Sequence, residues 1–315
     1  MSTQIEATPR PERKPKLPAK QRWALRGPLL PALTVLIVLT QLPFVVTVVI
    51  STFNWNIMYP DERHFAGLQN FRTVLSDNRM RDALVHTILL TAGVVILALI
   101  CGLALAVLLD RKFHGRALLR TMLITPFLIT PVAAMLVWKH LIFNPTYGLL
   151  NGITTQVLGL FGKDTIVQTD WISDKPLIAV AVPMIWQWTP FMMLILLAGL
   201  QSQSPDILEA ANMDGAGPWR IFRFISLSHL RPYMELSVVL GTIYISQSMD
   251  AVFTITQGGP GSASTTMPYE IYLTMFRKYD YGEAAAAGVV IVVITIIIAT
   301  FALRTLSSLV EESRS

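Results

Sequence analysis

Long apolar stretches without charged residues alternate along this chain with short charged segments. A helix that crosses a membrane needs about 20 predominantly apolar residues. The pattern therefore predicts an all-α polytopic membrane protein with six transmembrane helices. The predicted helices cover residues 29–53, 83–109, 121–143, 177–200, 236–249 and 284–303.

The charged segments predict the orientation of these helices. Of the 25 Lys and Arg residues, 16 fall in residues 1–26, 110–120, 201–232 and 304–315. Because Lys and Arg are enriched on the cytoplasmic side of a membrane, both ends of the chain are predicted to lie in the cytoplasm. The predicted domains are a disordered basic tail (1–26), a six-helix membrane domain (27–303) and a short cytoplasmic tail (304–315).

Two prolines, Pro126 and Pro131, lie within the third predicted helix. Proline has no N–H group and crowds the preceding turn, so the sequence predicts a kink there. The residues that follow this helix, 144–175, are polar and are predicted to form a loop on the outer side.

The composition agrees with a membrane protein. Hydrophobic residues make up 53% of the chain and charged residues 14%, whereas soluble proteins carry about 25% charged residues. The net charge of +5 comes from basic residues near the helix ends, so membrane orientation explains it better than nucleic-acid binding. The single cysteine, Cys101, excludes an internal disulfide and a cysteine-based metal site.

No part of the chain has the pattern of a nucleotide-binding loop. Such a loop needs glycine-bordered backbone amides followed by Lys and Ser or Thr. The nearest match, GLFGKD at residues 159–164, has the wrong spacing and ends in Asp. The centres of the six predicted helices also lack Asp, Glu, Lys and Arg, which ion-driven carriers often keep there. The sequence therefore predicts no catalytic residue, metal site or cofactor on this chain, and an energy supply from a partner.

Residues 201–232 form a polar segment between two predicted membrane helices. Ser204 and Pro205 favour the start of a short helix. Residues 215–217 (GAG) interrupt that helix, and Pro218 favours the start of another. The segment is too short for a domain, so we interpret it as a docking element on the cytoplasmic face.

The residues of this segment resemble the EAA loop of binding-protein-dependent ABC importer permeases. The matching positions are Glu209, Ala210, Ala211, Asp214, Gly215, Ala216, Trp219, Phe222, Ile225, Leu227 and Pro232. Ser228 stands where the family has its first proline. Three further segments resemble the carbohydrate branch of the family: FAGLQNF at 65–71, TQGGPG at 256–261 and YGEA at 281–284. Gln257 replaces a glycine of the second of these motifs.

The resemblance implies how the chain is coupled to its partners. An ABC ATPase dimer, which holds ATP and Mg, would dock on the loop through Glu209, Ala210, Ala211, Asp214, Gly215 and Ala216. A second homologous permease subunit and an extracytoplasmic solute-binding protein would complete a system in the bacterial plasma (inner) membrane. The binding protein would touch Gly258, Gly259, Pro260 and Gly261, although a simple turn explains these residues too. No nucleic acid is implied.

Polar and aromatic residues in two predicted helices are candidates for the substrate path. Hydrogen-bonding groups and aromatic faces hold sugars, and such groups gain little from exposure to lipid. The candidates are Trp186, Gln187, Trp188, Tyr244, Gln247 and Asp250. Interfacial anchoring of the tryptophans and hydrogen bonds between helices would explain the same residues.

The favoured interpretation is a permease subunit that moves a sugar, sugar alcohol or related carbohydrate. A stand-alone secondary carrier or channel for a small polar solute is the first alternative, and it predicts transport by the purified chain alone. A membrane-embedded enzyme is the second alternative, and it predicts clustered catalytic or metal-binding residues near a membrane face.

Overall fold

The computed structural model describes residues 29–162 and 165–312. The predicted basic tail, residues 1–26, lies outside these residues. The chain forms two compact units, one ending at Val49 and one beginning at Ile50. Helix α2 (Leu29–Ile50), without its last residue, forms the described part of the first unit. It carries no charged residue and is long enough to cross a membrane, as the sequence predicts.

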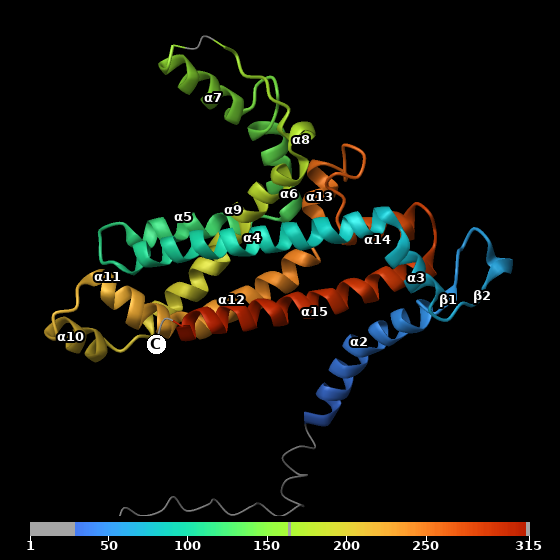
Figure 1. Cartoon of the computed structure of the whole chain (residues 1–315), viewed down its shortest axis with the longest axis horizontal. Coiled ribbons are helices and arrows are strands. Elements are labelled where there is room, and N and C mark those ends of the chain that lie inside the picture. Colours follow the sequence, from blue (N-terminus) through green and yellow to red (C-terminus); the bar gives the residue numbers. More distant parts are fainter. Residues whose placement is uncertain (1–28, 163–164, 313–315) are drawn as a thin grey trace, which may run out of the picture. The chain divides into compact units, whose positions relative to one another are not determined.

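Four long helices form the bundle of the second unit (Figure 1). They are α4 (Asn78–Asp110), α9 (Pro176–Gln201), α12 (Leu227–Ser246) and α15 (Tyr281–Glu312). The most extensive contact lies between α4 and α9. A Cβ added to Gly102 on α4 would lie 2.8 Å from Cβ of Met192 on α9, so the two backbones approach closely. Small residues permit such an approach between membrane helices.

The third predicted helix is broken rather than kinked. Helix α5 (Arg116–Leu128) and helix α6 (Pro131–Val137) meet at an angle of 100°. Helix α6 continues into the π-helical segment η2 (Trp138–Ile142). Pro131 is the first residue after the break, where its missing N–H removes a helical hydrogen bond.

Fewer described helices meet the length and composition of a membrane crossing than the six crossings that the sequence predicts. Within the described residues, α2, α4, α9 and α15 are long and apolar enough to cross a membrane, and the bent α5–α6 pair is a fifth candidate. The fifth predicted helix, residues 236–249, overlaps α12, which does not reach the same hydropathy. The first half of α12 carries His229, Arg231 and Glu235. Six crossings therefore remain a prediction.

Residues 144–175 are not a simple loop, contrary to the prediction. They contain α7 (Leu149–Leu160) and α8 (Trp171–Asp174). The buried Asn151 holds the segment together, because its amide donates to the carbonyl oxygens of Pro145 and Thr169 at 3.1 and 2.9 Å. Asp170 caps α8, and its hydrogen bond from Ser173 lowers the pKa of the Asp170 carboxyl below its usual value.

Two of the motifs noted in the sequence meet at one end of the bundle. Strands β1 (Phe53–Asn54) and β2 (His64–Phe65) form a small antiparallel pair, followed by α3 (Gln69–Ser76). The amide of Asn70 donates to the carbonyl oxygens of Ser51 and Phe53. A Cβ on Gly282 would collide with the same Phe53 carbonyl. These residues of FAGLQNF and YGEA thus have a structural role here.

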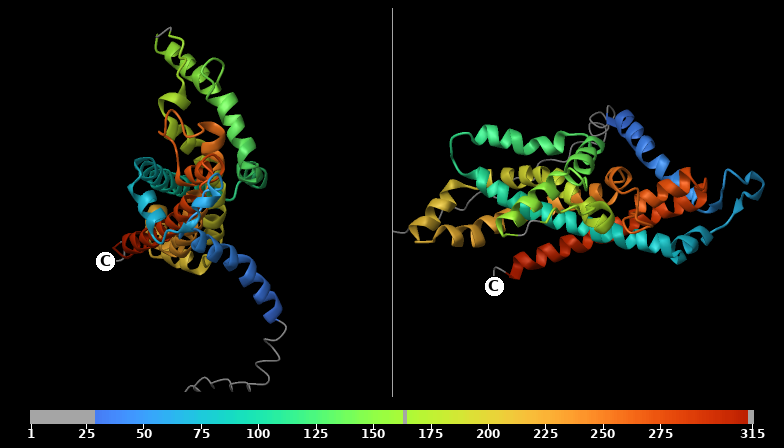
Figure 2. Two further views of the ribbon diagram at one scale, coloured as in Figure 1. Left: turned by 90° about the vertical axis from the view of Figure 1, so that its right-hand side faces the viewer. Right: turned by 90° about the horizontal axis from the view of Figure 1, so that it is seen from above.

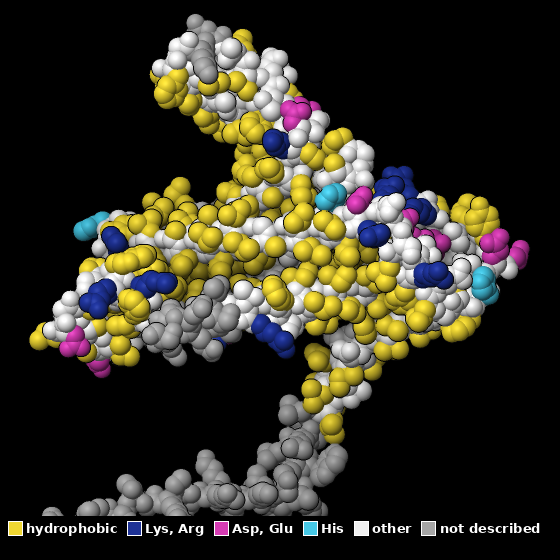
Figure 3. Space-filling model, in the orientation of Figure 1, with side chains coloured by type: hydrophobic (Ala, Val, Ile, Leu, Met, Phe, Trp, Pro, Cys, Tyr) yellow, Lys and Arg dark blue, Asp and Glu magenta, His cyan; other side chains and the backbone are white. Residues whose placement is uncertain are grey.

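Residues 201–232, the candidate coupling loop, begin at the other end of the second unit. Helices α10 (Pro205–Met213) and α11 (Pro218–Arg220) occupy that end, opposite α3 and α14 (Met267–Phe276) (Figures 1 and 2). Charged side chains gather toward these two ends, and the face between them is mainly apolar (Figure 3). This distribution suits a bundle that spans a bilayer.

Candidate coupling loop and translocation cavity

The predicted break in the coupling loop is confirmed at Gly215. Helix α10 begins with Pro205 and ends at Met213. Gly215 has φ +77°, and its N–H donates to the carbonyl of Asn212 at 3.0 Å. The N–H of Ala216 donates to the carbonyl of Ala211, also at 3.0 Å. Glycine adopts positive φ without steric cost, which makes it the usual residue at the end of a helix.

The second helix of the loop, which the sequence predicts to begin at Pro218, continues into the bundle. From Pro218 the chain runs through α11, the π-helical segment η3 (Ile221–Ser226) and α12 as one continuous helix. Ser228 and Pro232 both lie inside it. The second half of the motif is therefore the beginning of a bundle helix, and Ser228 lies inside that helix.

The six residues predicted to contact the ATPase lie on an accessible surface. Glu209, Ala210, Asp214 and Gly215 are exposed, and Ala211 and Ala216 are half-buried. Two large apolar side chains accompany them, since Met213 is 88% exposed and Trp219 is 71% exposed. The Trp219 ring packs on Phe222 at 5.9 Å between centroids. Met213 and Trp219 thus add exposed apolar side chains to an otherwise polar segment.

A cavity of about 350 Å³ lies where the broken third segment faces α9, α12 and α13 (Asp250–Ile255). Five of the six predicted substrate-path residues line it: Gln187, Trp188, Tyr244, Gln247 and Asp250. Trp186 does not line the cavity. Its ring instead meets the ring of Trp138 edge-on, with 5.8 Å between centroids.

The cavity wall combines an aromatic pair with hydrogen-bonding groups. The rings of Trp188 and Tyr244 are stacked at 5.9 Å, with 24° between their planes. Gln247 and Asp250 lie beyond the end of α12, and Asp250 begins α13. Gln187 is only 6% exposed, and its Nε2 donates to the carbonyl oxygen of Ile129 at 3.2 Å. One polar group of the set is therefore already engaged within the protein.

The sequence does not reveal the apolar part of the lining. These residues are Phe127, Ile129, Pro131, Met135, Met184 and Ala251, joined by the polar Ser248. The sequence alone does not distinguish these apolar lining residues from apolar residues that face lipid. The one available signal is Pro131, which marks the break that turns Phe127 and Met135 toward the same space.

The Gly258–Gly261 loop has a buried base and an exposed tip. Gly258 has φ +79°, and a Cβ there would lie 2.6 Å from Oγ1 of Thr265. Its carbonyl accepts hydrogen bonds from the N–H of Ser264 and from Oγ1 of Thr265. Pro260 and Gly261 are exposed. Only the tip is accessible to a protein that approaches from solvent.

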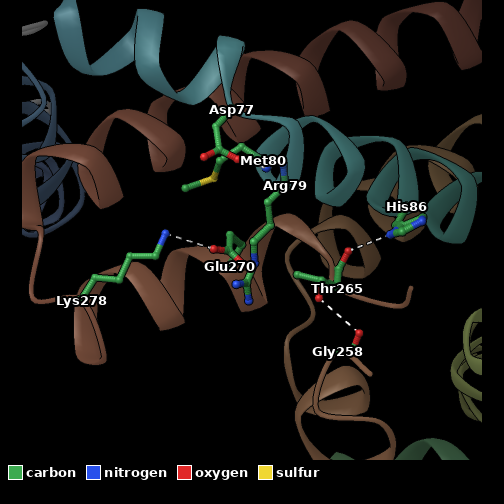
Figure 4. A network of polar contacts seen from close by, with 8 residues as sticks. All are labelled: Asp77, Arg79, Met80, His86, Gly258, Thr265, Glu270 and Lys278. Carbon is green, nitrogen blue, oxygen red and sulfur yellow. Dashed lines mark hydrogen bonds and ion pairs between the residues drawn. The ribbon is translucent and has the colours of Figure 1, made fainter. Parts of the chain in front are cut away.

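An ion cluster fixes the segment that follows this loop (Figure 4). Glu270 of α14 is completely buried, and it pairs with Nε of Arg79 at 2.9 Å and Nζ of Lys278 at 3.4 Å. Nearby, the carbonyl of Thr265 lies 3.1 Å from Nδ1 of His86. Because Arg79 and His86 belong to α4, the loop and α14 are held against one end of that helix.

Comparison with known proteins shows relatives along most of the chain. Residues 98–311 match the family described as "Binding-protein-dependent transport system inner membrane component". The trehalose/maltose transport system permease protein MalF of Thermococcus litoralis is 31% identical over 87% of this chain and 89% of its own length. The sn-glycerol-3-phosphate transport system permease protein UgpA of Salmonella typhi is 32% identical, over 78% of this chain and 82% of its own length.

A solved structure shares the fold. A chain of a bacterial alginate ABC transporter, in complex with an alginate pentasaccharide-bound periplasmic protein, superposes with a TM-score of 0.73. The two chains are 20% identical, and the match covers 90% of this chain and 93% of the other. Since the family match also covers more than half of the 315 residues, this chain belongs to the inner membrane components of binding-protein-dependent transport systems.

Proposed function

We propose that this chain is the permease subunit of an ATP-driven importer for a sugar, sugar alcohol or related carbohydrate. The observation that carries the proposal is the stacked pair of Trp188 and Tyr244 in a cavity that also contains Gln247 and Asp250. Aromatic faces and a few convergent polar groups suit a hydroxylated ring. Relatives whose names include trehalose, maltose and glycerol 3-phosphate support this class of solute.

The coupling loop would link ATP hydrolysis by the partner to the opening of the cavity. The family supplies translocation subunits, and ATP is hydrolysed by a separate subunit. We assign the docking of that ATPase dimer, with its ATP and Mg, to the exposed α10 and the turn at Gly215. The carboxylates of Glu209 and Asp214 would pair with basic groups of the ATPase, and Met213 would add apolar contact. ATP-driven closure of the dimer would move α10 and turn the cavity outward.

The proposed system has two further partners. A second homologous permease would supply the other half of the pathway, and a solute-binding protein would deliver the solute near Pro260 and Gly261. We also propose six crossings with both tails in the cytoplasm. Helix α12 has 20 residues, which rise about 30 Å, the thickness of the hydrocarbon core.

Two substitutions in the coupling loop test the proposal. Gly215→Pro forces φ from +77° to about −65°, and Glu209→Lys reverses an exposed charge. In the complete complex in liposomes, each should lower binding-protein-stimulated uptake of labelled trehalose or maltose by about tenfold, within the range typical of coupling between sites. ATP hydrolysis by the bound ATPase should continue.

The matched control is Gly217→Ala. Gly217 has φ −71°, and an added Cβ would meet nothing within 4 Å, so this variant should transport normally. Normal coupled uptake in both loop variants would refute the docking role. Transport by the purified chain without an ATPase would instead favour a stand-alone carrier or channel.

A further inference from the structure

The break in the third apolar segment forms part of the cavity wall. Ile129 and Thr130, between α5 and α6, have extended backbones with ψ near 138° and 136°. Residues before proline avoid the helical region, and proline itself cannot donate a hydrogen bond. A break at such a place frees backbone carbonyls, which must find other donors within a membrane protein.

Gln187 supplies one such donor. Its side-chain Nε2 donates to the Ile129 carbonyl at 3.2 Å, so a residue of α9 bonds to the backbone of the break. The ring of Phe127, just before the break, also packs against α9. Phe127 stacks on Phe191 at 5.4 Å and meets the edge of Trp188 at 5.8 Å. Thus α9 holds the break through one hydrogen bond and one aromatic cluster.

The two arms of the broken segment pack against different partners. Helix α5 packs mainly on α9, whereas α6 packs mainly on α13. In the continuation of α6, Nζ of Lys139 donates to the carbonyl of Thr254 on α13 at 2.8 Å. A movement of α6 together with α13 relative to α9 would therefore change the width of the cavity, and the break would act as the joint.

We propose that Gln187 is a positioning residue that sets the width of the translocation cavity. Its hydrogen bond to the Ile129 carbonyl, called the latch below, ties the joint, which is the break at residues 129–130, to α9. Its donated hydrogen bond stabilises the broken arrangement, in which the Ile129 carbonyl faces α9. This proposal rests on the proposed function, because it concerns the cavity assigned there to the solute. The role differs from solute contact, since the Gln187 residue is only 6% exposed and its Nε2 already donates to the Ile129 carbonyl.

The rate at which a thiol in the cavity is labelled tests the effect of the latch on the cavity, and this measurement does not require transport. Cys101→Ser removes the chain's own cysteine, and Ser248→Cys then places a thiol in the cavity lining. In the reconstituted complex, Gln187→Met keeps the side-chain length and removes the donor. The rate of labelling by a hydrophilic maleimide should change by about tenfold, equivalent to about 1.4 kcal/mol. An unchanged rate would overturn the proposal.

Thr189→Val is the matched control on the same helix. The Thr189 hydroxyl donates within α9, to the carbonyl of Ile185 at 2.7 Å, so its loss should leave the labelling rate unchanged. If Gln187→Met does not assemble, Phe127→Leu loosens the same joint from its aromatic side. A changed rate in that variant supports the latch, and an unchanged rate overturns it.

A double-mutant cycle separates positioning from solute contact. Pro131→Ala removes the residue that enforces the break, so Gln187→Met should have little further effect on sugar uptake in that background. Additive losses would show that Gln187 acts on the solute instead. The latch variant should also lower the maximal uptake rate and leave the half-saturating concentration of binding protein unchanged.

The two proposals fail in different ways. If the latch is wrong and the function is right, the wild-type complex imports sugar and Gln187→Met does not alter labelling. If the function is wrong and the latch is right, Gln187→Met alters labelling, and no sugar or sugar alcohol is imported by the wild-type complex.

Discussion

At the scale of single residues, Gln257 shows what a departure from a family motif means physically. The motif carries a glycine at this position, and the structure gives Gln257 a φ of +51°. Side chains other than glycine are strained in this left-handed region because Cβ crowds the following carbonyl. The motif's glycine is therefore explained by backbone conformation, without any contact to a partner.

Gln257→Gly should stabilise the protein by about 1 kcal/mol, since glycine adopts positive φ freely. Thermal unfolding of the purified complex measures the change as a higher midpoint. Ala263→Gly, in the same exposed loop, is the control, because Ala263 is not among the described residues with positive φ. It should lower the midpoint slightly, and an equal effect of both variants would contradict the strain at Gln257.

The cavity shows which site residues are predictable. Trp188, Tyr244 and Asp250 were expected to share a cavity because polar and aromatic groups are unusual within apolar helices, and the structure brings them together. Their contact with a solute stays a prediction. Met184 gave no such signal, because an apolar side chain has the same sequence pattern whether it faces lipid or a cavity. Trp186, two residues from Trp188, lies outside the lining and packs on Trp138.

At the scale of helices, the close contact between α4 and α9 requires a residue without a side chain at Gly102. A Cβ on Gly102 would lie 2.8 Å from Cβ of Met192 and 2.9 Å from the backbone nitrogen of Met193. A backbone atom cannot move aside as the end of a side chain does. An alanine at this position would therefore push the two helices apart.

Gly102→Ala should destabilise the purified complex by about 1–3 kcal/mol, the usual cost of overpacking a core. Gly93→Ala is a matched control on the same helix, because its added Cβ would meet nothing within 4 Å. The control should be neutral or stabilising by up to about 1 kcal/mol through helix propensity. Thermal unfolding compares the two variants, and an equal loss in both would refute the close contact.

The limits of α9 were predictable from the sequence, whereas α12 begins nine residues before its predicted range of 236–249. Helix α9 differs from its predicted range of 177–200 by one residue at each end, because length and apolar composition decide a membrane helix. The prolines of the third segment predict a kink, but its 100° angle goes with the packing of α5 on α9 and of α6 on α13, which the sequence does not show. The helices between 144 and 175 depend on Asn151, whose bonding partners are far away in the sequence.

At the scale of the whole molecule, the sides of the membrane on which the loops lie depend on whether α12 crosses it. If it crosses the membrane, the coupling loop and the loop at 257–266 lie on opposite sides. If it does not, they lie on the same side, and the described helices cross five times when the bent α5–α6 pair counts as one crossing. The partial polarity of α12 does not exclude a crossing, because Arg231 and Glu235 are paired at 3.0 Å and lie in its first half. Paired charges near a helix end are tolerated in membranes.

Thiol labelling from the two sides of the membrane decides this question. In a Cys101→Ser background, Met213→Cys and Ala263→Cys each place one thiol at an exposed position. With six crossings and both tails inside, a membrane-impermeant maleimide should label Ala263→Cys in intact cells and Met213→Cys only after the membrane is opened. Labelling of both from the same side would show that α12 does not cross. Opposite labelling with the sides exchanged would confirm the crossing and reverse the orientation, which would place the coupling loop beyond the reach of a cytoplasmic ATPase.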